Sequence, residues 1–464
     1  MRIHLLIENA YASGGTVRTT FNTAGALAAR GHDVEIVSVH RRRRVSFYAV
    51  PPHVRLRPLL DAYSAAREKR PASLLGRLRL KTVLWGLGKP SVLYARGDNR
   101  GGGRNFSLAS DVALVHYLRT QRDGVVVGTR PGLNVAIARW ARPTVTTVGQ
   151  DHMNLKSYPS VLKGEIRRHY GDLDALVTLT ASDARDYAKL LRRRTTVLSI
   201  PNGVPDVGDH HAALDPSSKI VVAAGRLTPQ KGYDRLVKAW AIVSAEHPDW
   251  QLRIYGGGPP EHTEDLQQLI EDLGVQHTAH LMGATKQLWA EMSKASLYVM
   301  SSRYEGFPMV LLEAMAIGLP VVAFDCPTGP RDAIDHGVDG MLVRNGDIRG
   351  LAREMDALMR DFDTRRALGA AARRKAERYD VGELAIRWEK LFAELSADKA
   401  VSSRQSVRSL ASRAWGHRLP RGARTALRRR GARGLLRAAV PAIRSSAQEL
   451  RSRVALPGRR HGGS

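Results

Sequence analysis

The chain has 464 residues, of which 43% are hydrophobic, and it carries a formal net charge of +28 with a pI near 10.8. This length is too great for one ordinary hydrophobic core, so we expect two domains with additional segments. The single cysteine, Cys326, excludes an intramolecular disulfide framework and suits a reducing compartment. No uncharged apolar run approaches the roughly 18 residues that a membrane-spanning helix needs, so the composition predicts a soluble or peripheral protein.

The positive charge is distributed unevenly along the chain. Residues 397–464 contain 17 Lys or Arg and 2 acidic residues, a net 17 − 2 = +15. Further basic residues gather at 41–44 and at 67–81. Such clusters indicate an anionic partner, which could be membrane headgroups, nucleic acid or a phosphorylated substrate. Apolar residues interleaved with cations at 73–88 favour a membrane surface, with a solvated basic face as the alternative.

The first half of the chain predicts alternating strands and helices. "RIHLLIE" is a short apolar run that ends at Glu8, so we expect a buried strand there rather than a signal peptide. The glycines Gly14 and Gly15 follow as a turn, and a helical pattern then ends at Gly31. Further strands are predicted at 33–39, 124–129, 143–149 and 175–180. This alternation is typical of a parallel sheet with helices on both faces.

Changes in composition divide the chain into segments. Residues 1–205 are predicted to form a Rossmann-like N-terminal domain, within which 40–110 read as a basic insertion. A linker rich in Pro, Gly, Asp and Ser precedes a second series of strands and helices, which predicts another Rossmann-like domain at 206–380. The amphipathic helix 381–396 is expected to cross back to the first domain. The basic tail 397–464 is weakly hydrophobic, so we expect it to be partly disordered.

Two carboxylates lie in an otherwise apolar strand–helix–strand unit. Glu305 is predicted in the loop after the first strand, and Glu313 in the helix between Pro308 and Gly318. An unpaired buried charge is costly, so Glu313 must have partners or reach a ligand. The helix N-terminus would attract a phosphate, whereas carboxylates match the hydroxyl donors of a sugar. The alternative is a plain loop acid and a salt-bridged helix residue.

Two cations are predicted at the same edge of the second sheet. In "GRLTPQKG", Arg226 follows a strand and Lys231 precedes a helix. Arg and Lys bind phosphate oxygens, and cations beside a helix N-terminus are unfavourable unless an anion joins them. The acids and cations together predict a nucleotide-sugar site, although both cations could also be surface charges.

The sequence resembles the retaining GT-B glycosyltransferases of family 4 over about residues 1–396. The resemblance rests on "EGFPMVLLE", "GRLTPQKG", "IPNGV", "IYGGGP", "GLPVVA", "GVDGMLV" and the early glycine turn. It implies two Rossmann-like, doubly wound α/β domains that face each other across a cleft. Asp339 departs from the pattern, because the family often has Asn at that position.

The resemblance also implies roles for particular residues. Glu305 would contact the transferred sugar, Glu313 the ribose, and Arg226 with Lys231 the diphosphate. His152 would lie near the sugar and the reaction centre, although it could also be an ordinary buried histidine. The remaining substrate-binding positions implied are Gly306, Phe307, Met309 and Val310, with Gly14 and Gly15, which could also form only a tight turn.

The implied reaction is metal-independent transfer of a hexosyl unit with retention at the anomeric carbon. The acceptor would attack from the face of the leaving group, and a donor phosphate oxygen would take its proton. No cofactor is expected beyond the nucleotide-diphosphate sugar, for which UDP is favoured. The acceptor would be a glycan, glycolipid or polyanionic cell-wall polymer, and the expected location is cytoplasmic, peripheral at the inner face of the cell membrane.

Three further hypotheses remain open at this stage. Arg130, after a strand of the first domain, either meets an acceptor or is a structural cation. A nucleotide-sugar epimerase of the same fold would act without an acceptor. A basic nucleic-acid-binding protein would need stacking aromatics or a recognition module; aromatics are 6% of the chain and we find no such module, so no specific nucleic acid is expected.

Overall fold

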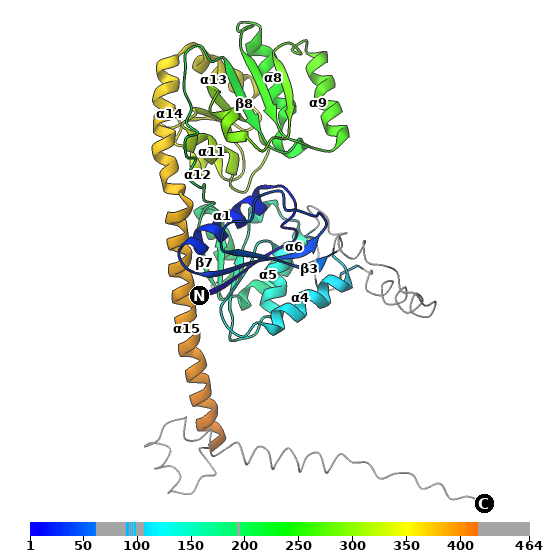
Figure 1. Ribbon diagram of the computed structural model, residues 1–464, viewed down its shortest axis with the longest axis vertical. Coiled ribbons are helices and arrows are strands. Elements are labelled where there is room, and N and C mark those ends of the chain that lie inside the picture. Colours follow the sequence, from blue (N-terminus) through cyan, green and yellow to red (C-terminus); the bar gives the residue numbers. More distant parts are fainter. Residues whose placement is uncertain are drawn as a thin grey trace, which may run out of the picture. The chain divides into compact units, whose positions relative to one another are not determined.

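The structure, a computed structural model, describes residues 1–61, 90–91, 93, 95, 97–98, 106–192 and 195–415. The basic stretch 67–81, the loop residues 99–105 and most of the basic tail (416–464) lie outside these ranges. Residues Met1–Ala397 form one compact unit, which contains two lobes (Figure 1). Among the described residues, no helix is long and apolar enough to cross a membrane.

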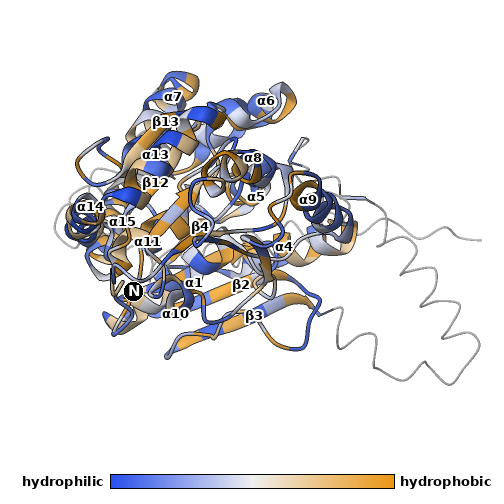
Figure 2. Cartoon of the chain, turned by 90° about the horizontal axis from the view of Figure 1, so that it is seen from above, coloured by the Kyte–Doolittle hydropathy of each residue, from blue (hydrophilic) through white to orange (hydrophobic). Residues whose placement is uncertain are grey.

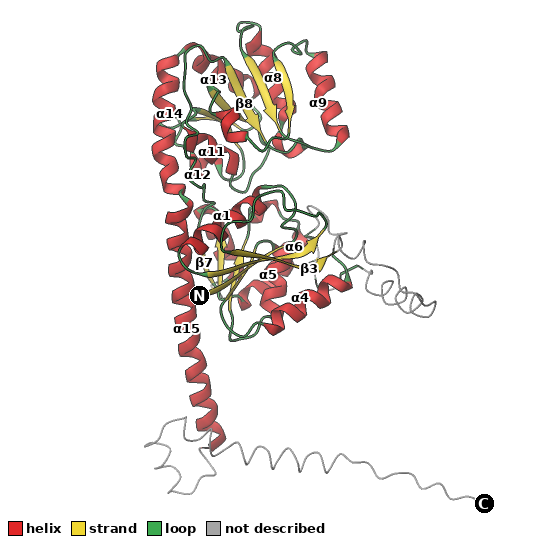
Figure 3. Cartoon of the chain, in the orientation of Figure 1, coloured by secondary structure: helices red, strands yellow, loops and turns green. Residues whose placement is uncertain are grey.

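The first lobe is built on a parallel sheet, in which the described residues form seven strands in the order β3-β2-β1-β4-β5-β6-β7 (Figure 3). The strands are β1 (Arg2–Ile7), β2 (Asp33–Arg41), β3 (Val54–Asp61), β4 (Val125–Gly128), β5 (Thr146–Gln150), β6 (Ala175–Thr178) and β7 (Thr196–Ser199). The central strands are buried on both faces, which explains their continuous apolar sequences.

Helices cover both faces of the first sheet. They are α1 (Gly15–Ala29), α4 (Leu108–Thr120), α5 (Pro131–Trp140), α6 (Ser160–His169) and α7 (Ala181–Leu191), with 3-10 turns at Leu155–Ser157 and Tyr170–Asp172. Ile3 of β1 faces a core shared with α1, whereas Leu6 of the same strand faces a core shared with α4 to α7. Trp388 and Phe392 of the terminal helix α15 (Val381–Trp415) complete the α1 side.

The second lobe repeats this architecture with strands in the order β10-β9-β8-β11-β12-β13. They are β8 (Ile220–Ala224), β9 (Gln251–Tyr255), β10 (Ala279–Gly283), β11 (Leu297–Met300), β12 (Val321–Asp325) and β13 (Met341–Arg344). The helices are α8 (Tyr233–Ser244), α9 (Pro260–Asp272), α10 (Leu288–Met292), α11 (Met309–Ile317), α12 (Pro330–Ala333), α13 (Ile348–Arg360) and α14 (Phe362–Ala376), with 3-10 turns at Pro229–Lys231 and Glu377–Tyr379. Figure 2 shows α9 and α14 with both blue and orange segments, as expected for amphipathic helices on the outside of a sheet. The predicted pair of doubly wound α/β domains is confirmed.

Strand β3 lies within the segment that the sequence predicted to be an insertion. It pairs in parallel with β2 and forms the edge of the first sheet. Arg55 and Arg57 are exposed and alternate with the less exposed Val54 and Leu56. Charged side chains at alternate positions are a common way to protect an edge strand, and here they obscured the strand pattern in the sequence.

The strand order of each sheet reverses at one place. In the first lobe the reversal falls between β1 and β4, and in the second between β8 and β11. Loops that leave two neighbouring strands at such a reversal diverge to opposite faces of the sheet, and ligands bind between them. The site should therefore be sought in the loops that follow these strands.

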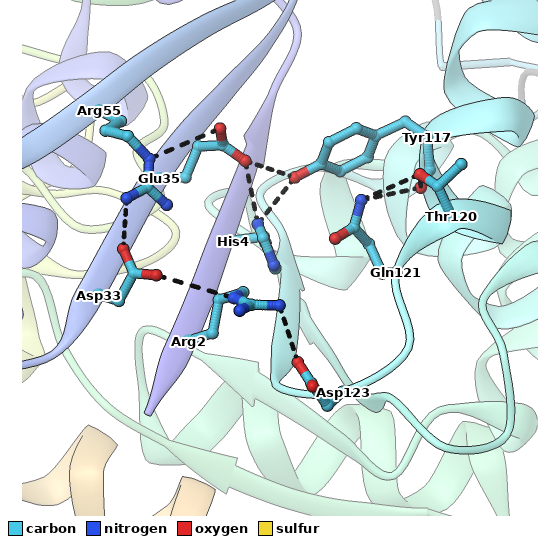
Figure 4. Close-up of polar contacts among 9 residues, drawn as sticks. All are labelled: Arg2, His4, Asp33, Glu35, Arg55, Tyr117, Thr120, Gln121 and Asp123. Atoms are coloured by element: carbon cyan, nitrogen blue, oxygen red, sulfur yellow. Dashed lines mark hydrogen bonds and ion pairs between the residues drawn. The ribbon is translucent and has the colours of Figure 1, made fainter.

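A buried polar cluster ties β1, β2 and α4 together at the other end of the first sheet (Figure 4). The Tyr117 hydroxyl donates to Glu35 Oε2 at 2.8 Å, and His4 Nδ1 lies 3.1 Å from the same oxygen. Hydrogen bonds from His4 and Tyr117 lower the pKa of Glu35 against the opposing effect of burial. The cluster provides partners for Glu35 Oε2 within the core, whereas His4 Nε2 has no partner among the described residues.

Candidate functional site

Glu305 and Lys231 lie in the loops that follow the two strands on either side of the strand-order reversal in the second lobe. Glu305 follows β11, and Lys231 ends the 3-10 turn after β8. Lys231 Nζ lies 2.6 Å from Glu305 Oε1, and Ser302 Oγ donates to the same oxygen at 2.6 Å. Glu305 is 6% exposed, so the pair is desolvated and its geometry is fixed by the surrounding loops.

Glu313 lies on α11 and is 0% exposed. Its Oε2 is 3.1 Å from Arg18 Nη1 and accepts a hydrogen bond from Trp289 Nε1 at 3.1 Å. Its other oxygen, Oε1, has no hydrogen-bond partner among the residues that the structure describes. Burial raises the pKa of Glu313, whereas Arg18 and Trp289 act to lower it. A buried carboxylate with one vacant acceptor is unfavourable by itself, and a hydroxyl donor would satisfy it.

Arg226 offers the free cation of the site. It follows β8 after Gly225 and is exposed, and in the described part of the chain its side chain makes no hydrogen bond or ion pair. Its neighbour Lys231 is already paired with Glu305. Of the two predicted phosphate ligands, Arg226 is therefore the one available to an anion in this structure. The described residues contain no cluster of three or more His, Cys, Asp or Glu that could hold a metal ion.

The N-terminus of α11 lies beside Glu305. Its N-cap residue is Pro308, and no side chain caps the helix, so the first N–H groups lack a side-chain acceptor. Met309 and Phe307 are buried, and Val310 is partly buried. The Phe307 carbonyl accepts a hydrogen bond from Asn202 Nδ2 at 3.1 Å, which anchors the loop to the linker between the lobes.

The loops after β11 and β5 bring the two lobes into contact. A Cβ on Gly306 would lie 1.9 Å from the carbonyl oxygen of His152, so only glycine allows this approach. Asn154 Nδ2 donates to the Glu305 carbonyl at 3.3 Å. The His152 loop of the first lobe is thus held against the Glu305 loop of the second.

His152 directly follows a residue with a buried carboxyl group, Asp151. Burial lowers the pKa of His152 to about 4, so its imidazole is neutral at pH 7, and its Nε2 has no partner. The preceding residue, Asp151, accepts hydrogen bonds from Tyr170, Tyr187 and, at 2.8 Å, Asn134 Nδ2. Burial raises the pKa of Asp151 to about 7 in spite of hydrogen bonds that act to lower it. This network fixes the strand end from which the His152 loop departs.

Gly14 and Gly15 lie at the strand reversal of the first lobe. Gly14 adopts φ 141°, a conformation that favours glycine, and a Cβ at either position would meet open space. A ligand could therefore approach this backbone closely. Arg130, after β4, is instead bound to acidic groups of its own lobe: it pairs with Glu8 and, at 2.7 Å, with Asp98. An acceptor would have to compete with these carboxylates for Arg130.

Several residues of this site are not marked as site residues by the sequence pattern. Arg18 and Trp289 hold Glu313, Asn154 and Asn202 connect the Glu305 loop to other segments, and Ser302 binds Glu305. The motif "IPNGV" contains Asn202, and this signal could have identified it. No comparable signal marks Arg18, because its partner lies about three hundred residues away in the other lobe.

Comparison with known proteins agrees with this geometry. Residues 210–375 match the family model described as "Glycosyl transferases group 1". The matched segment lies in the second lobe and contains Arg226, Lys231, Glu305 and Glu313.

Similarity to individual proteins extends beyond residues 210–375. The chain is 34% identical over 430 residues to an exopolysaccharide phosphotransferase of Streptomyces coelicolor, covering 91% of this chain and 43% of that protein. It is 25% identical to an uncharacterized glycosyltransferase of Haemophilus influenzae, covering 84% of this chain and 99% of that protein. A mutant of TarM from S. aureus, solved with fondaparinux, α-GlcNAc-glycerol and UDP, superposes with a TM-score of 0.67 at 17% identity, over 84% of this chain and 99% of that one. The last likeness concerns the fold, which is the GT-B arrangement of two Rossmann-like lobes.

Proposed function

We propose that this protein is a retaining glycosyltransferase that moves a hexosyl unit from a nucleotide-diphosphate sugar to a hydroxyl of a glycan, glycolipid or cell-wall polymer. The observation that carries the proposal is Glu313, a fully buried carboxylate with one oxygen left without a partner. A ribose hydroxyl is a donor of the right kind for this oxygen. UDP is the favoured nucleotide, and its presence in the TarM complex supports this choice.

The diphosphate is assigned to Arg226 and the uncapped start of α11. Arg226 has its guanidinium available, and the first amides of α11 point their N–H groups toward an anion at that end. Lys231 is assigned to the same diphosphate, with Glu305 holding its ammonium until the donor binds. Glu305 and the Gly306 amide are assigned to the hydroxyls of the transferred sugar.

Retention at the anomeric carbon is proposed to follow from attack on the leaving group's own face. A donor phosphate oxygen takes the proton of the acceptor hydroxyl as the bond to the diphosphate breaks. Arg226, Lys231 and the α11 amides stabilise the negative charge that develops on the diphosphate, and this stabilisation requires no bound metal or cofactor. His152, neutral at pH 7, can donate or accept a hydrogen bond near the reaction centre but carries no charge there.

The acceptor is assigned to the first lobe, with Gly14 and Gly15 close to the donor diphosphate. Arg130 is assigned to the acceptor side as well, provided that an anionic acceptor displaces Asp98. We further propose a cytoplasmic enzyme, peripheral at the inner membrane face through its basic segments. The proposed unit boundaries remain 1–205, 206–380, 381–396 and 397–464.

A panel of nucleotide sugars tests this proposal. Thermal-shift measurements should show one donor that stabilises the protein, by ~2.7 kcal/mol at a hundredfold excess over Kd. With that donor and a panel of glycan acceptors, mass spectrometry should find a product heavier than the acceptor by one sugar. Conversion of the donor alone to its epimer would show an epimerase instead, and a product carrying sugar and phosphate would show phosphotransfer.

A further inference from the structure

A basic groove lies between α6 and α7 on the first lobe, outside the site described above. It has a volume of about 470 Å³. Its lining residues are Leu155, Lys156, Lys163, Arg167, Asp186, Lys189, Leu190 and Arg192. Five of these are cations and one is an acid, a net 5 − 1 = +4 in one hollow.

Most of this charge is not neutralised by the described residues of the chain. Lys156 pairs with Asp186 at 3.0 Å, and Lys163 Nζ donates to the Lys156 carbonyl at 3.2 Å. Arg167, Lys189 and Arg192 are exposed and make no side-chain ion pair or hydrogen bond with the residues that the structure describes. Converging cations repel one another, so a surface that keeps them together is stabilised when an anion binds.

The groove is close in sequence to the loop of the proposed reaction centre. Leu155, at its edge, directly follows Asn154, whose side chain donates to the Glu305 carbonyl. The Leu155 amide is itself fixed by Asp183 Oδ1 of α7 at 2.9 Å. One edge of the groove is therefore formed by the residue that follows the Asn154 contact with the Glu305 loop, three positions after His152.

The surface around the groove has few groups that could enter a bilayer. Peripheral membrane sites combine cations with exposed apolar side chains. Among the described residues of α6 and α7, Val161 is the one large apolar side chain that is strongly exposed. A hollow lined by long cationic side chains instead suits separated anionic groups on a flexible chain, each of which can be bound by a guanidinium or an ammonium.

We propose that this groove binds the acceptor, and that the acceptor is a polymer with phosphodiester groups along its backbone. This inference rests on the proposed function for its biological meaning, but binding in the groove is independent of turnover. Arg167, Lys189 and Arg192 hold successive phosphodiesters, and the chain end enters the site beside His152. Binding weakens with rising salt because the attraction is between solvated charges.

The test uses the full-length protein and a synthetic oligo(glycerol phosphate), with a neutral glucan oligosaccharide of similar length for comparison. The triple variant R167S/K189S/R192S removes the three free cations of the groove. The matched control R349S/R374S/R378S removes three exposed cations of the second lobe and gives the same net charge. Isothermal titration calorimetry at two salt concentrations measures binding, and a thermal shift with the donor identified above is recorded for each protein.

The groove variant should bind the oligo(glycerol phosphate) at least about tenfold more weakly, while the control and the donor shift stay unchanged. Equal loss in both variants would show a general charge effect and overturn the proposal. Unchanged binding of the oligo(glycerol phosphate) by the groove variant would also overturn the proposal. So would a groove variant whose only defect is weaker sedimentation with anionic liposomes. If the oligomer binds in the groove but no nucleotide sugar shifts the protein, the proposed function fails and the binding site stands.

Discussion

Arg18 and Glu313 form an ion pair that joins the two lobes, with Arg18 Nη1 3.1 Å from Glu313 Oε2. Arg18 lies on α1, directly after the Gly14–Gly15 turn, and Glu313 lies on α11. The Arg18 guanidinium also lies over the Trp289 ring, at 5.3 Å from its centroid. The pair leaves Glu313 Oε1 as the acceptor to which we assign the nucleotide ribose.

Removing the cation of this pair should destabilise the protein. R18M leaves a fully buried carboxylate without its counter-charge, so we expect the free energy of unfolding at pH 7 to fall by about 3 kcal/mol. Since burial raises the pKa of Glu313, the loss should shrink as the pH falls and the carboxylate becomes protonated. Urea unfolding of R18M, E313Q and R18M/E313Q measures this. The double variant should be more stable than R18M, and an R18M variant as stable as the wild type would contradict the role of the pair.

Removal of the Arg226 side chain should lower the rate of sugar transfer. R226A removes a group assigned to the departing diphosphate, so we expect at least ~10²-fold lower kcat/KM with an unchanged melting temperature. K231A should lose a similar factor. K238A serves as the control, because Lys238 is an exposed residue of the same lobe. Near-normal turnover in R226A and K231A would remove both assignments.

A substitution that forces Gly306 and His152 apart should lower the activity. In G306A the new methyl group would collide with the His152 carbonyl at 1.9 Å, so the two loops must separate. A displacement of about 1 Å at a reaction centre can cost on the order of 10²-fold in rate, and we expect a loss of that size in kcat/KM. At Gly257 an added Cβ would meet its nearest atom at an ordinary 3.7 Å, so G257A should retain activity. Equal activity of the two variants would refute this role of the contact.

The local pattern of the sequence predicted much of the fold and part of the site. Alternating apolar runs and glycines predicted both sheets, and Gly318 ends α11 in the left-handed conformation expected of a helix C-cap. Glu305, Arg226 and Lys231 were placed at one sheet edge because parallel strands end on the same side. These features depend on residues that are close together in the chain.

Contacts between distant segments could not be predicted in this way. The pairing of Lys231 with Glu305 depends on the spacing of two loops, and that of Arg18 with Glu313 on the packing of two lobes. The edge strand β3 was missed because its arginines resemble a solvated basic segment. Asp339, the one departure from the family pattern, pairs with Lys375 at 2.9 Å, so its acidity has a partner that the motif alone did not reveal.

Asp151 should make stability depend on pH in an unusual direction. Its pKa is about 7 in the fold, whereas an unfolded Asp titrates near pH 4, so the folded state binds the extra proton between these values. Below about pH 4 this group adds to the free energy of unfolding. As the pH rises to 7 this contribution is lost, and the total loss is on the order of 3 kcal/mol. Relative to wild type, D151N should lack this decline, whereas D209N, at an exposed position, should retain it. Parallel stability curves for wild type and D151N over this range would contradict the assignment.

We propose that the second lobe binds a nucleotide through Glu313 and Arg226. A crystal structure of the protein with UDP tests it most directly. We predict a ribose hydroxyl within hydrogen-bond distance of Glu313 Oε1 and the diphosphate at Arg226 and the N-terminus of α11. A nucleotide bound elsewhere, with Glu313 Oε1 still without a partner, would rule out this binding mode.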